Sequence, residues 1–226
     1  SPKVVEHYIK SHENDTSDKI YPNLMLVRSF NFLMENTGRK VLDYGCGYGE
    51  NLIFLTKKGF KVHGVEVNSD LINWVELKCK IKQVPKNLYS LELASDDNRL
   101  IQDDETFDHV ISLGVLEMLG DKAAATLYIN ELTRVLKPGG KMIISTLHPE
   151  NSFVVQSKKI AEEKFSFSGK EMDKEVQLQY ELYIPKDANS FSKIFPKSCK
   201  VDEIGSWNNV YCNVNGKHYC ALITKK

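Results

Sequence analysis

Long apolar runs, net charge and paired cysteines are all missing from this sequence. Its longest apolar stretches, such as VISLGVLEML and MIISTL, are far below the roughly 20 residues that cross a bilayer, and its N-terminus has no basic region followed by an apolar one. The 30 basic and 30 acidic side chains balance, so no net field draws the protein onto nucleic acid or an anionic membrane. We therefore expect a soluble, cytoplasmic protein that binds neither nucleic acid nor a membrane.

The five cysteines form an odd, scattered set without a Cys-x-x-Cys pair. This pattern argues against a disulfide framework and against a structural zinc site. We predict reduced thiols and no metal centre.

Strand-like and helical patterns alternate between residues 40 and 147. Apolar segments are separated by stretches with apolar residues at helical spacing, which predicts a parallel sheet with helices on both faces. A further helix is expected ahead of them, in LMLVRSFNFLMEN. The expected strands are KVLDYG, KVHGVEV, LYSLEL, FDHVISLGVLEML and KMIISTL.

The last third of the chain has a different pattern. Apolar residues alternate with polar ones at Val176, Leu178, Tyr180 and Leu182, which is typical of a half-exposed antiparallel strand in an insertion. Farther on, Asn215-Gly216 stands between two strand-like runs and predicts a type I′ hairpin. We therefore expect the sheet to end in an antiparallel edge.

The segment VLDYGCGYGEN, residues 41–51, places three glycines directly after a strand-like run. A dinucleotide fingerprint needs Gly-x-Gly-x-x-Gly, but Glu50 stands where the third glycine belongs. A carboxylate there would oppose a pyrophosphate at the helix N-terminus. The loop, with Asp43 before it, therefore favours a nucleoside that carries a cationic centre. The alternative is a tight turn between strand and helix that binds no ligand.

Acidic residues also follow the next two strand-like segments. Glu66 closes the second one, where a carboxylate can bind both hydroxyls of a ribose. Asp96 and Asp97 follow the third. A solvated carboxylate at a strand end is the alternative for each.

Taken in order, VLDYGCGYG, Glu66, Asp96, FDHVISLGVLEML and VLKPGG resemble the class I S-adenosylmethionine-dependent methyltransferases, specifically their small-molecule group. The resemblance covers about residues 40–147. It implies an α/β, Rossmann-like seven-stranded, mostly parallel sheet with an antiparallel C-terminal hairpin and a small β insertion after strand five. On this basis residues 1–226 form a single methyltransferase domain, with an N-terminal arm and helix (1–36), a cofactor-binding core (40–147), a substrate-side insertion (150–195) and a terminal hairpin (205–224).

The resemblance also implies S-adenosylmethionine as the cofactor and assigns roles to the matching positions. Those beside its methionine portion are Asp43, Gly45, Cys46, Gly47, Gly49, Ser112, Leu113 and Gly114. Those beside its nucleoside are Glu66 at the ribose, Val67 and Leu113 in apolar contact with the purine, and Asp96 and Asp97 at the adenine.

Two residues are catalytic candidates. His148 follows the fifth strand, at the end of the sheet where α/β proteins bind ligands, and it titrates in the range needed for a general base. Tyr21 lies in the N-terminal arm, which can fold over the cofactor and exclude water. The alternative for His148 is a loop histidine with a local hydrogen bond, and the alternative for Tyr21 is a surface tyrosine. Glu117 is expected to cap or orient nearby groups.

Several readings of function remain open at this point. The first is an enzyme that methylates an oxygen or nitrogen of a small metabolite or sugar-like acceptor. The second is a non-catalytic module that binds S-adenosylmethionine for regulation or assembly, and a dehydrogenase that uses NAD is a poorer third. The sequence does not identify the acceptor, and it leaves open whether the protein forms a homodimer.

Overall fold

The computed structural model describes residues 21–33, 39–95, 99–170, 177–208, 210–211 and 214–226. Within these ranges none of the helices has the length and apolar character that spanning a membrane requires.

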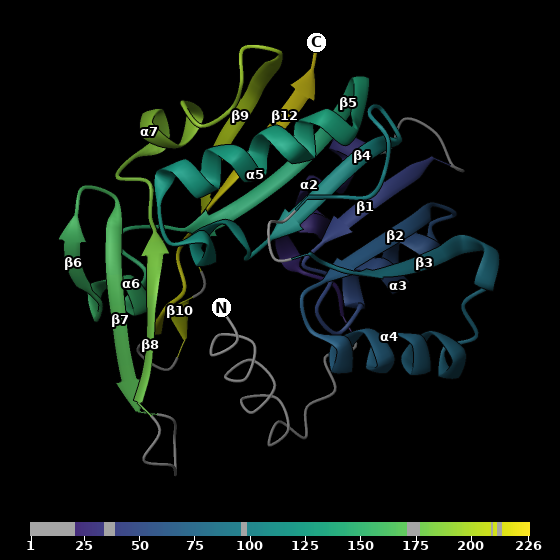
Figure 1. Cartoon of the computed structure of the whole chain (residues 1–226), viewed down its shortest axis with the longest axis horizontal. Helices are drawn as coiled ribbons and strands as arrows, with labels where there is room; N and C mark the ends of the chain where they lie inside the picture. The colour runs from purple at the N-terminus through teal and green to yellow at the C-terminus, as the bar shows by residue number, and fades with distance from the viewer. Residues whose placement is uncertain (1–20, 34–38, 96–98, 171–176, 209, 212–213) are drawn as a thin grey trace.

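A seven-stranded sheet in the order β3-β2-β1-β4-β5-β12-β9 organises the chain (Figure 1). The pairs β3–β2, β2–β1, β1–β4 and β4–β5 are parallel, as the alternating pattern predicts. β12 is antiparallel to both of its neighbours, β5 and β9. The strands are β1 (Lys40–Tyr44), β2 (Lys61–Glu66), β3 (Tyr89–Leu93), β4 (Phe107–Leu113), β5 (Leu136–Leu147), β9 (Cys199–Trp207) and β12 (His218–Lys225).

The sheet ends in an antiparallel edge, as predicted, but the terminal hairpin differs from the prediction in its extent and its turn. Its strands are β9 and β12, so it begins at Cys199, and β12 lies inside the sheet while β9 forms the edge. Asn215-Gly216 is not its turn, because β10 (Val210–Tyr211) and β11 (Val214–Asn215) form a separate small ladder between the long strands. The Asn215 side chain accepts from Lys217 N, and Asn215 N donates to Ser152 Oγ at 2.7 Å. Asn215 therefore takes part in a local turn and in a contact with α6, and not in the turn of the long hairpin.

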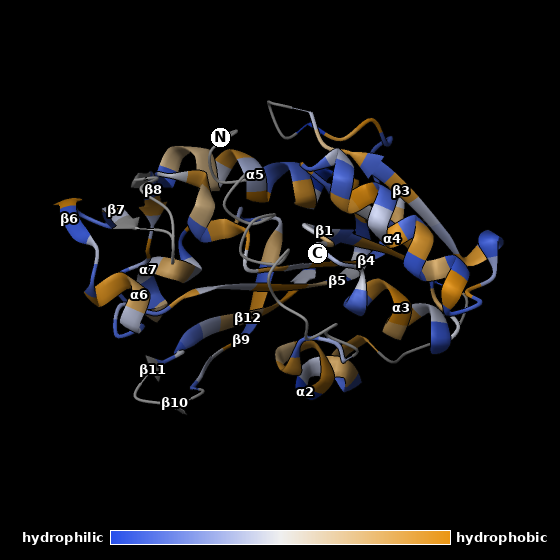
Figure 2. Cartoon of the chain, turned by 90° about the horizontal axis from the view of Figure 1, so that it is seen from below, coloured by the Kyte–Doolittle hydropathy of each residue, from blue (hydrophilic) through white to orange (hydrophobic). Residues whose placement is uncertain are grey.

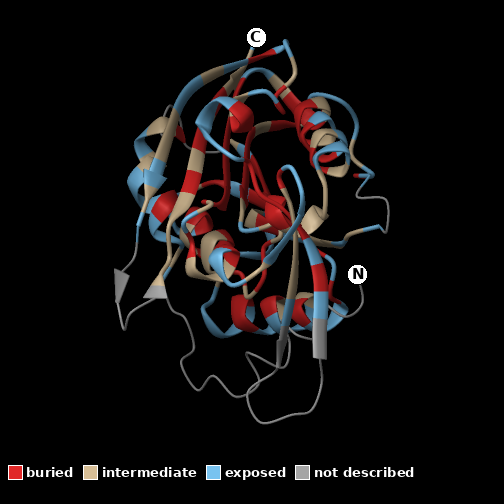
Figure 3. Cartoon of the chain, turned by 90° about the vertical axis from the view of Figure 1, so that its left-hand side faces the viewer, coloured by how far each residue is buried: buried red, intermediate tan, exposed pale blue. Residues whose placement is uncertain are grey.

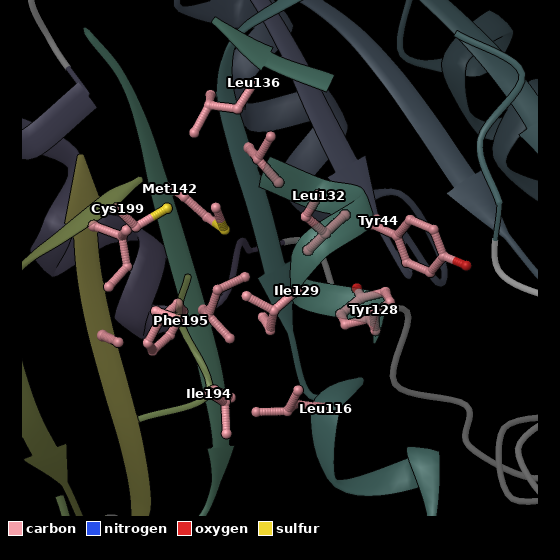
Figure 4. Packing of buried hydrophobic residues seen from close by; sticks show 14 of the residues in the cluster. Tyr44, Leu116, Tyr128, Ile129, Leu132, Leu136, Met142, Ile194, Phe195 and Cys199 are labelled. Carbon is pink, nitrogen blue, oxygen red and sulfur yellow. The ribbon is translucent and has the colours of Figure 1, made fainter. Parts of the chain in front are cut away.

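Helices cover both faces of the sheet, and each face has its own apolar core. α2 and α5 lie on opposite sides of the strands in Figure 2. The first core packs α2 (Leu24–Leu33), α3 (Glu50–Lys57) and α4 (Ser69–Ile81) against one face. The second packs α5 (Lys122–Val135) and the segment of α7 (Ala188–Ser192) against the other (Figure 4). Buried residues accordingly concentrate along the central strands in Figure 3.

The ends of two helices have clear local causes. α3 ends before Gly59, whose φ of 87° suits the left-handed position after a helix. α4 is capped by Asn68, whose side chain accepts from Asp70 N at 2.7 Å. The remaining short turns are η1 (Lys86–Leu88), η2 (Leu116–Leu119) and α6 (Ser152–Val155).

The predicted insertion is a separate three-stranded antiparallel sheet. It contains β6 (Lys158–Ala161), β7 (Lys164–Lys170) and β8 (Gln177–Tyr183). The buried Glu163 ties it to the main domain, because its carboxylate accepts from Lys186 N at 3.0 Å and Lys122 Nζ at 3.2 Å, and from the Ser190 hydroxyl. The insertion therefore stands beside η2 and α5, at the end of the sheet where the β4 and β5 strands finish (Figure 1).

Candidate cofactor and acceptor site

The turn between β1 and α3 is anchored to the neighbouring strand. Gly45 N and Cys46 N both donate to Val65 O, at 2.8 and 3.0 Å, and Gly49 N donates to Cys46 O at 2.9 Å. The Cys46 thiol is buried and faces the core, since a Cβ on Gly64 would lie 3.1 Å from its Sγ atom. Cys46 therefore borders the turn through its main chain.

Two glycines of this turn have no room for a side chain. Gly45 has φ of 74°, and a Cβ there would lie 2.3 Å from Val115 Cγ2. Gly49 has φ of 79°, and a Cβ there would lie 2.8 Å from Val75 Cγ1. Both the left-handed backbone and the close neighbours require glycine. The turn is thereby packed directly against the residues that follow β4 and against α4.

The Glu66 carboxylate holds the turn from β2. Its Oε2 accepts from Gly47 N at 3.0 Å and its Oε1 accepts from Val67 N at 2.8 Å. Burial raises the pKa of this carboxyl, and the backbone N–H donors act against that rise. The carboxylate also accepts from Asn68 N. Because a carboxylate has about four acceptor positions, Glu66 can still accept from a ribose hydroxyl without releasing the turn.

Asp43, at the end of β1, is a buried acid with one carboxyl oxygen that no described residue contacts by a hydrogen bond. Its side chain is 1% exposed, and within the described ranges its Oδ2 has no hydrogen-bond partner. Burial, followed by the nearby charges of Glu66 and Glu50, raises the pKa of Asp43 to about 8. A carboxyl in this state gains most from a cationic or N–H-bearing ligand, which would supply the missing partner. The site therefore fits a ligand with an ammonium and a sulfonium group.

Glu50 does not by itself keep phosphates away from the turn, contrary to the prediction. Its Oε1 accepts from Lys78 Nζ at 2.8 Å, and Lys78 is itself buried. Because this ion pair compensates the charge of Glu50, its carboxylate alone does not exclude a pyrophosphate. Asp43 and Glu66 carry that argument instead.

The nucleoside side of the predicted site is only partly described. Val67 is half exposed at the end of β2, so its apolar side chain is available to a purine. Asp96 and Asp97 lie outside the described residues. Their predicted contacts with the adenine remain predictions.

The residues at the end of β4 face the predicted cofactor site with their backbone more than with their side chains. The buried Ser112 hydroxyl is hydrogen-bonded to Tyr128 OH at 2.6 Å and therefore points into the core. Gly114 N donates to Ser145 Oγ at 3.0 Å, which joins the ends of β4 and β5. Leu113 is half-buried between them.

The two predicted catalytic residues lie in different surroundings. His148 is buried just after β5, with its ring centroid 4.4 Å from that of Tyr219, and its Nδ1 accepts from Glu150 N at 3.0 Å. Burial, with the charge of Lys217, lowers the pKa of His148. Tyr21 is 64% exposed just ahead of α2. Among the described residues, Tyr21 has no contact that assigns it a role.

Residues 21–183 match the sequence family described as a methyltransferase domain. The chain belongs to this methyltransferase family. The structure of a SAM-dependent methyltransferase from Methanosarcina mazei has the same fold, with a TM-score of 0.74 over 91% of this chain and 98% of that one, at 16% identity. The predicted family, the Rossmann-like fold class and S-adenosylmethionine as the cofactor of the family are thereby confirmed.

Curated methyltransferases resemble this one over its core. A ubiquinone biosynthesis O-methyltransferase from Alkalilimnicola ehrlichii is 30% identical over 49% of this chain and 42% of its own length. A tRNA U34 carboxymethyltransferase from Hydrogenovibrio crunogenus is 30% identical over 60% of this chain and 38% of its own length. This methyltransferase thus spans less than half the length of either relative.

Two features of the methyltransferase site were not evident from the sequence. Glu117, which was expected to cap or orient nearby groups, is hydrogen-bonded to Thr146 and to its own main chain, but its carboxyl is buried and its Oε2 has no geometrically defined hydrogen bond to a described residue. Thr146 lies beside it on β5, and no motif marks it in the apolar run MIISTL. Groups of three or more His, Cys, Asp or Glu side chains that could hold a metal ion do not occur in the described ranges.

Proposed function

We propose that the protein transfers a methyl group from S-adenosylmethionine to an oxygen or nitrogen of a small-molecule acceptor. The observation that carries this proposal is the buried Asp43 carboxyl, which lacks a partner at Oδ2 and lies beside a glycine turn anchored by Glu66. A ligand that brings positive charge and N–H donors supplies what this carboxyl lacks, and a diphosphate does not. We further propose that residues 1–226 act together as one methyltransferase domain.

The proposed cofactor contacts follow from the positions of the described residues. Asp43 and the backbone of Gly45, Cys46, Gly47 and Gly49 border the methionine portion. The backbone of Ser112, Leu113 and Gly114 closes it from β4. Glu66 accepts from the ribose hydroxyls, and Val67 covers one side of the purine.

When bound, S-adenosylmethionine supplies a methyl group on a positively charged sulfur, which is displaced in line by the acceptor. The protein's task is then to hold an acceptor lone pair about 3 Å from the methyl carbon and to exclude water. The turn, the β4 end and the insertion provide rigid elements for this purpose. A proton acceptor is needed only if the acceptor is a hydroxyl or an ammonium group.

An aromatic cluster lies on the insertion side, where we place the acceptor, and it favours a partly apolar compound. Phe153, Phe167 and Tyr180 stack between α6 and the insertion, with centroid distances of 4.2 Å for Phe153–Phe167 and 5.2 Å for Phe167–Tyr180. Aromatic faces of this kind pack well against planar groups. The balanced charge of the chain also makes a polyanionic acceptor a poorer fit than a small molecule.

The catalytic roles of His148 and Tyr21 remain proposals. Because His148 Nδ1 accepts a backbone N–H, the neutral ring carries its proton on Nε2 and offers a hydrogen-bond donor there. A role as general base would require the bond to Glu150 N to be broken. We expect His148→Ala to leave cofactor affinity unchanged and to lower turnover, as a residue that orients the acceptor would.

Glu66→Gln is expected to weaken the binding of S-adenosylmethionine and S-adenosylhomocysteine equally, by about 1–3 kcal/mol. The amide keeps one acceptor oxygen but loses the charge and one of the two acceptors that hold Gly47 N and Val67 N. Calorimetric titration of both ligands measures the loss. Glu92→Gln, on the neighbouring strand β3, is the control and should retain wild-type affinities; a variant at Glu66 with unchanged affinities would remove its ribose assignment.

The proposed function is tested by titrating the wild-type protein calorimetrically with S-adenosylmethionine, S-adenosylhomocysteine and NAD. We expect saturable binding of the first two and none of NAD. Saturable binding of NAD without any signal from S-adenosylmethionine would reject the proposal.

A further inference from the structure

Glu117 is a buried acid at the carboxyl end of the sheet, in the η2 turn after β4. Its side chain is 5% exposed, and within the described ranges its Oε2 atom has no hydrogen-bond partner. Burial raises the pKa of this carboxyl to about 7. A buried polar group without a partner is costly, so a fold that retains one has a candidate for binding or catalysis.

Its neighbours place this carboxyl beside the proposed methionine end of the cofactor. A Cβ on Gly114 would lie 3.9 Å from Glu117 Oε1. The buried Thr146 hydroxyl of β5 lies next to the carboxyl, and a hydrogen bond from it, with one from the main chain of Glu117, acts against the rise in the pKa of Glu117. On either side of Glu117, Leu116 is buried in the core that includes α5 (Figure 4) and Met118 packs on the apolar cluster of the insertion. Glu117 therefore lies between the cofactor side and the acceptor side.

We propose that Glu117, with Thr146 beside it, binds the O–H or N–H group of the acceptor and takes its proton during methyl transfer. This inference rests on the proposed function and narrows it, because the acceptor is then a hydroxyl or amine compound. A carboxylate acceptor would be repelled by the ionised Glu117 and would bring no proton.

The proposed step balances in atoms and electrons. The acceptor oxygen or nitrogen forms a bond to the methyl carbon, and the carbon–sulfur bond breaks with its electron pair remaining on sulfur. The proton of the acceptor moves to a Glu117 carboxylate oxygen. Thr146 can donate a hydrogen bond to the carboxylate before transfer and thereby orient it.

Charged groups on the elements that pack against η2 are already paired. His148 lies just after β5, and its Nδ1 accepts a hydrogen bond from Glu150 N. Within the described part of the chain, Glu117 itself forms no salt bridge, so an incoming hydroxyl or ammonium group meets no competing cation there. On α5 and β8, Tyr128 is hydrogen-bonded to Ser112, Lys122 pairs with Glu163 and Glu181 pairs with Lys164. The buried Tyr183 hydroxyl of β8 has no hydrogen-bond partner among the described residues, and it is uncharged.

The test compares two cofactor analogues and needs no acceptor. Sinefungin carries an amine on the carbon that replaces the sulfonium centre, so its ammonium group lies where the methyl group would point, whereas S-adenosylhomocysteine has no group there. At pH 8 we expect the wild-type protein to bind sinefungin about tenfold or more tightly than S-adenosylhomocysteine. In Glu117→Gln this preference should fall to near unity while S-adenosylhomocysteine affinity stays unchanged. Glu76→Gln, in a surface ion pair on α4, is the control and should keep the wild-type preference.

The wild-type protein alone supplies a second arm. Lowering the pH from 8 to 6 protonates Glu117 and should reduce the preference for sinefungin. Protonation of Asp43 changes both affinities alike, because the two ligands share their amino-acid and adenosine portions, and it therefore cancels in the ratio.

Three results would overturn the inference. The first is an equal preference in Glu117→Gln and wild type, and the second is a wild-type preference that does not change between pH 8 and pH 6. The third is a wild-type protein that binds neither S-adenosylmethionine nor S-adenosylhomocysteine, in which case the proposed function itself fails and the role of Glu117 with it.

Discussion

Replacing Asp43 with asparagine is expected to stabilise the ligand-free protein at pH 8 and to weaken its binding of S-adenosylmethionine. Burial and the charges of Glu66 and Glu50 raise the pKa of Asp43 to about 8, from 3.8 as the reference value. Between these two pH values the folded protein holds a proton that the unfolded chain has released, so the stability contributed by this group falls as the pH rises. Asparagine removes that penalty while keeping the shape of the side chain.

The expected gain at pH 8 is about 1–2 kcal/mol in the free energy of unfolding, or a rise of a few degrees in Tm. The gain should shrink as the pH is lowered toward 4, where the unfolded chain retains the proton too. The same variant should lose about 1–3 kcal/mol of S-adenosylmethionine affinity, because the charged hydrogen bond to the ligand is lost.

Thermal melts of the ligand-free protein at several pH values, together with calorimetric titration, measure both effects. Asp103→Asn is the matched control, because Asp103 is exposed and should change neither quantity. An Asp43→Asn variant that is less stable than wild type at pH 8, or that binds S-adenosylmethionine equally well, would contradict the account of this carboxyl as one retained for a ligand.

Gly45→Ala is expected to lower the free energy of unfolding by roughly 2–4 kcal/mol. Two costs add in this variant. The backbone has φ of 74°, which is strained for alanine, and the new Cβ would lie 2.3 Å from Val115 Cγ2. The turn would have to move away from the residue after β4, so cofactor affinity should fall as well.

A matched substitution separates the two costs. Gly139 has a similar φ of 73°, but a Cβ there meets nothing within 4 Å, so Gly139→Ala should show only the backbone cost of roughly 1–2 kcal/mol. Combining Gly45→Ala with Val115→Ala should recover the part due to the clash, and Val115→Ala alone completes the double-mutant cycle. Urea unfolding measures all four variants. Equal losses in Gly45→Ala and Gly139→Ala would show that the contact with Val115 is unimportant.

The parts of this structure that were predicted from the sequence depend on local patterns. The apolar segments from KVLDYG to KMIISTL are each flanked by helical spacing, which is sufficient to predict five parallel strands. The glycine turn was recognised because its residues are contiguous. The same holds for the alternating pattern around Tyr180 in the insertion.

The parts that could not be predicted depend on contacts between residues far apart in the chain. The ion pair between Glu50 and Lys78 joins two helices, and no feature of either segment predicts this pair. Asn215-Gly216 carries a strong turn signal, but the register of β12 against β9 leaves that pair outside the turn. Glu117 becomes a buried acid beside Thr146 only when η2 packs against β5.

A crystal structure with S-adenosylhomocysteine would show whether the carboxylate-flanked turn binds a sulfur nucleoside. We expect the ligand's amino group within hydrogen-bond distance of the Asp43 carboxyl, and a ribose hydroxyl on the Glu66 carboxylate. A turn that stays empty beside a ligand bound elsewhere, or that instead surrounds a diphosphate when NAD is soaked in, would contradict this expectation.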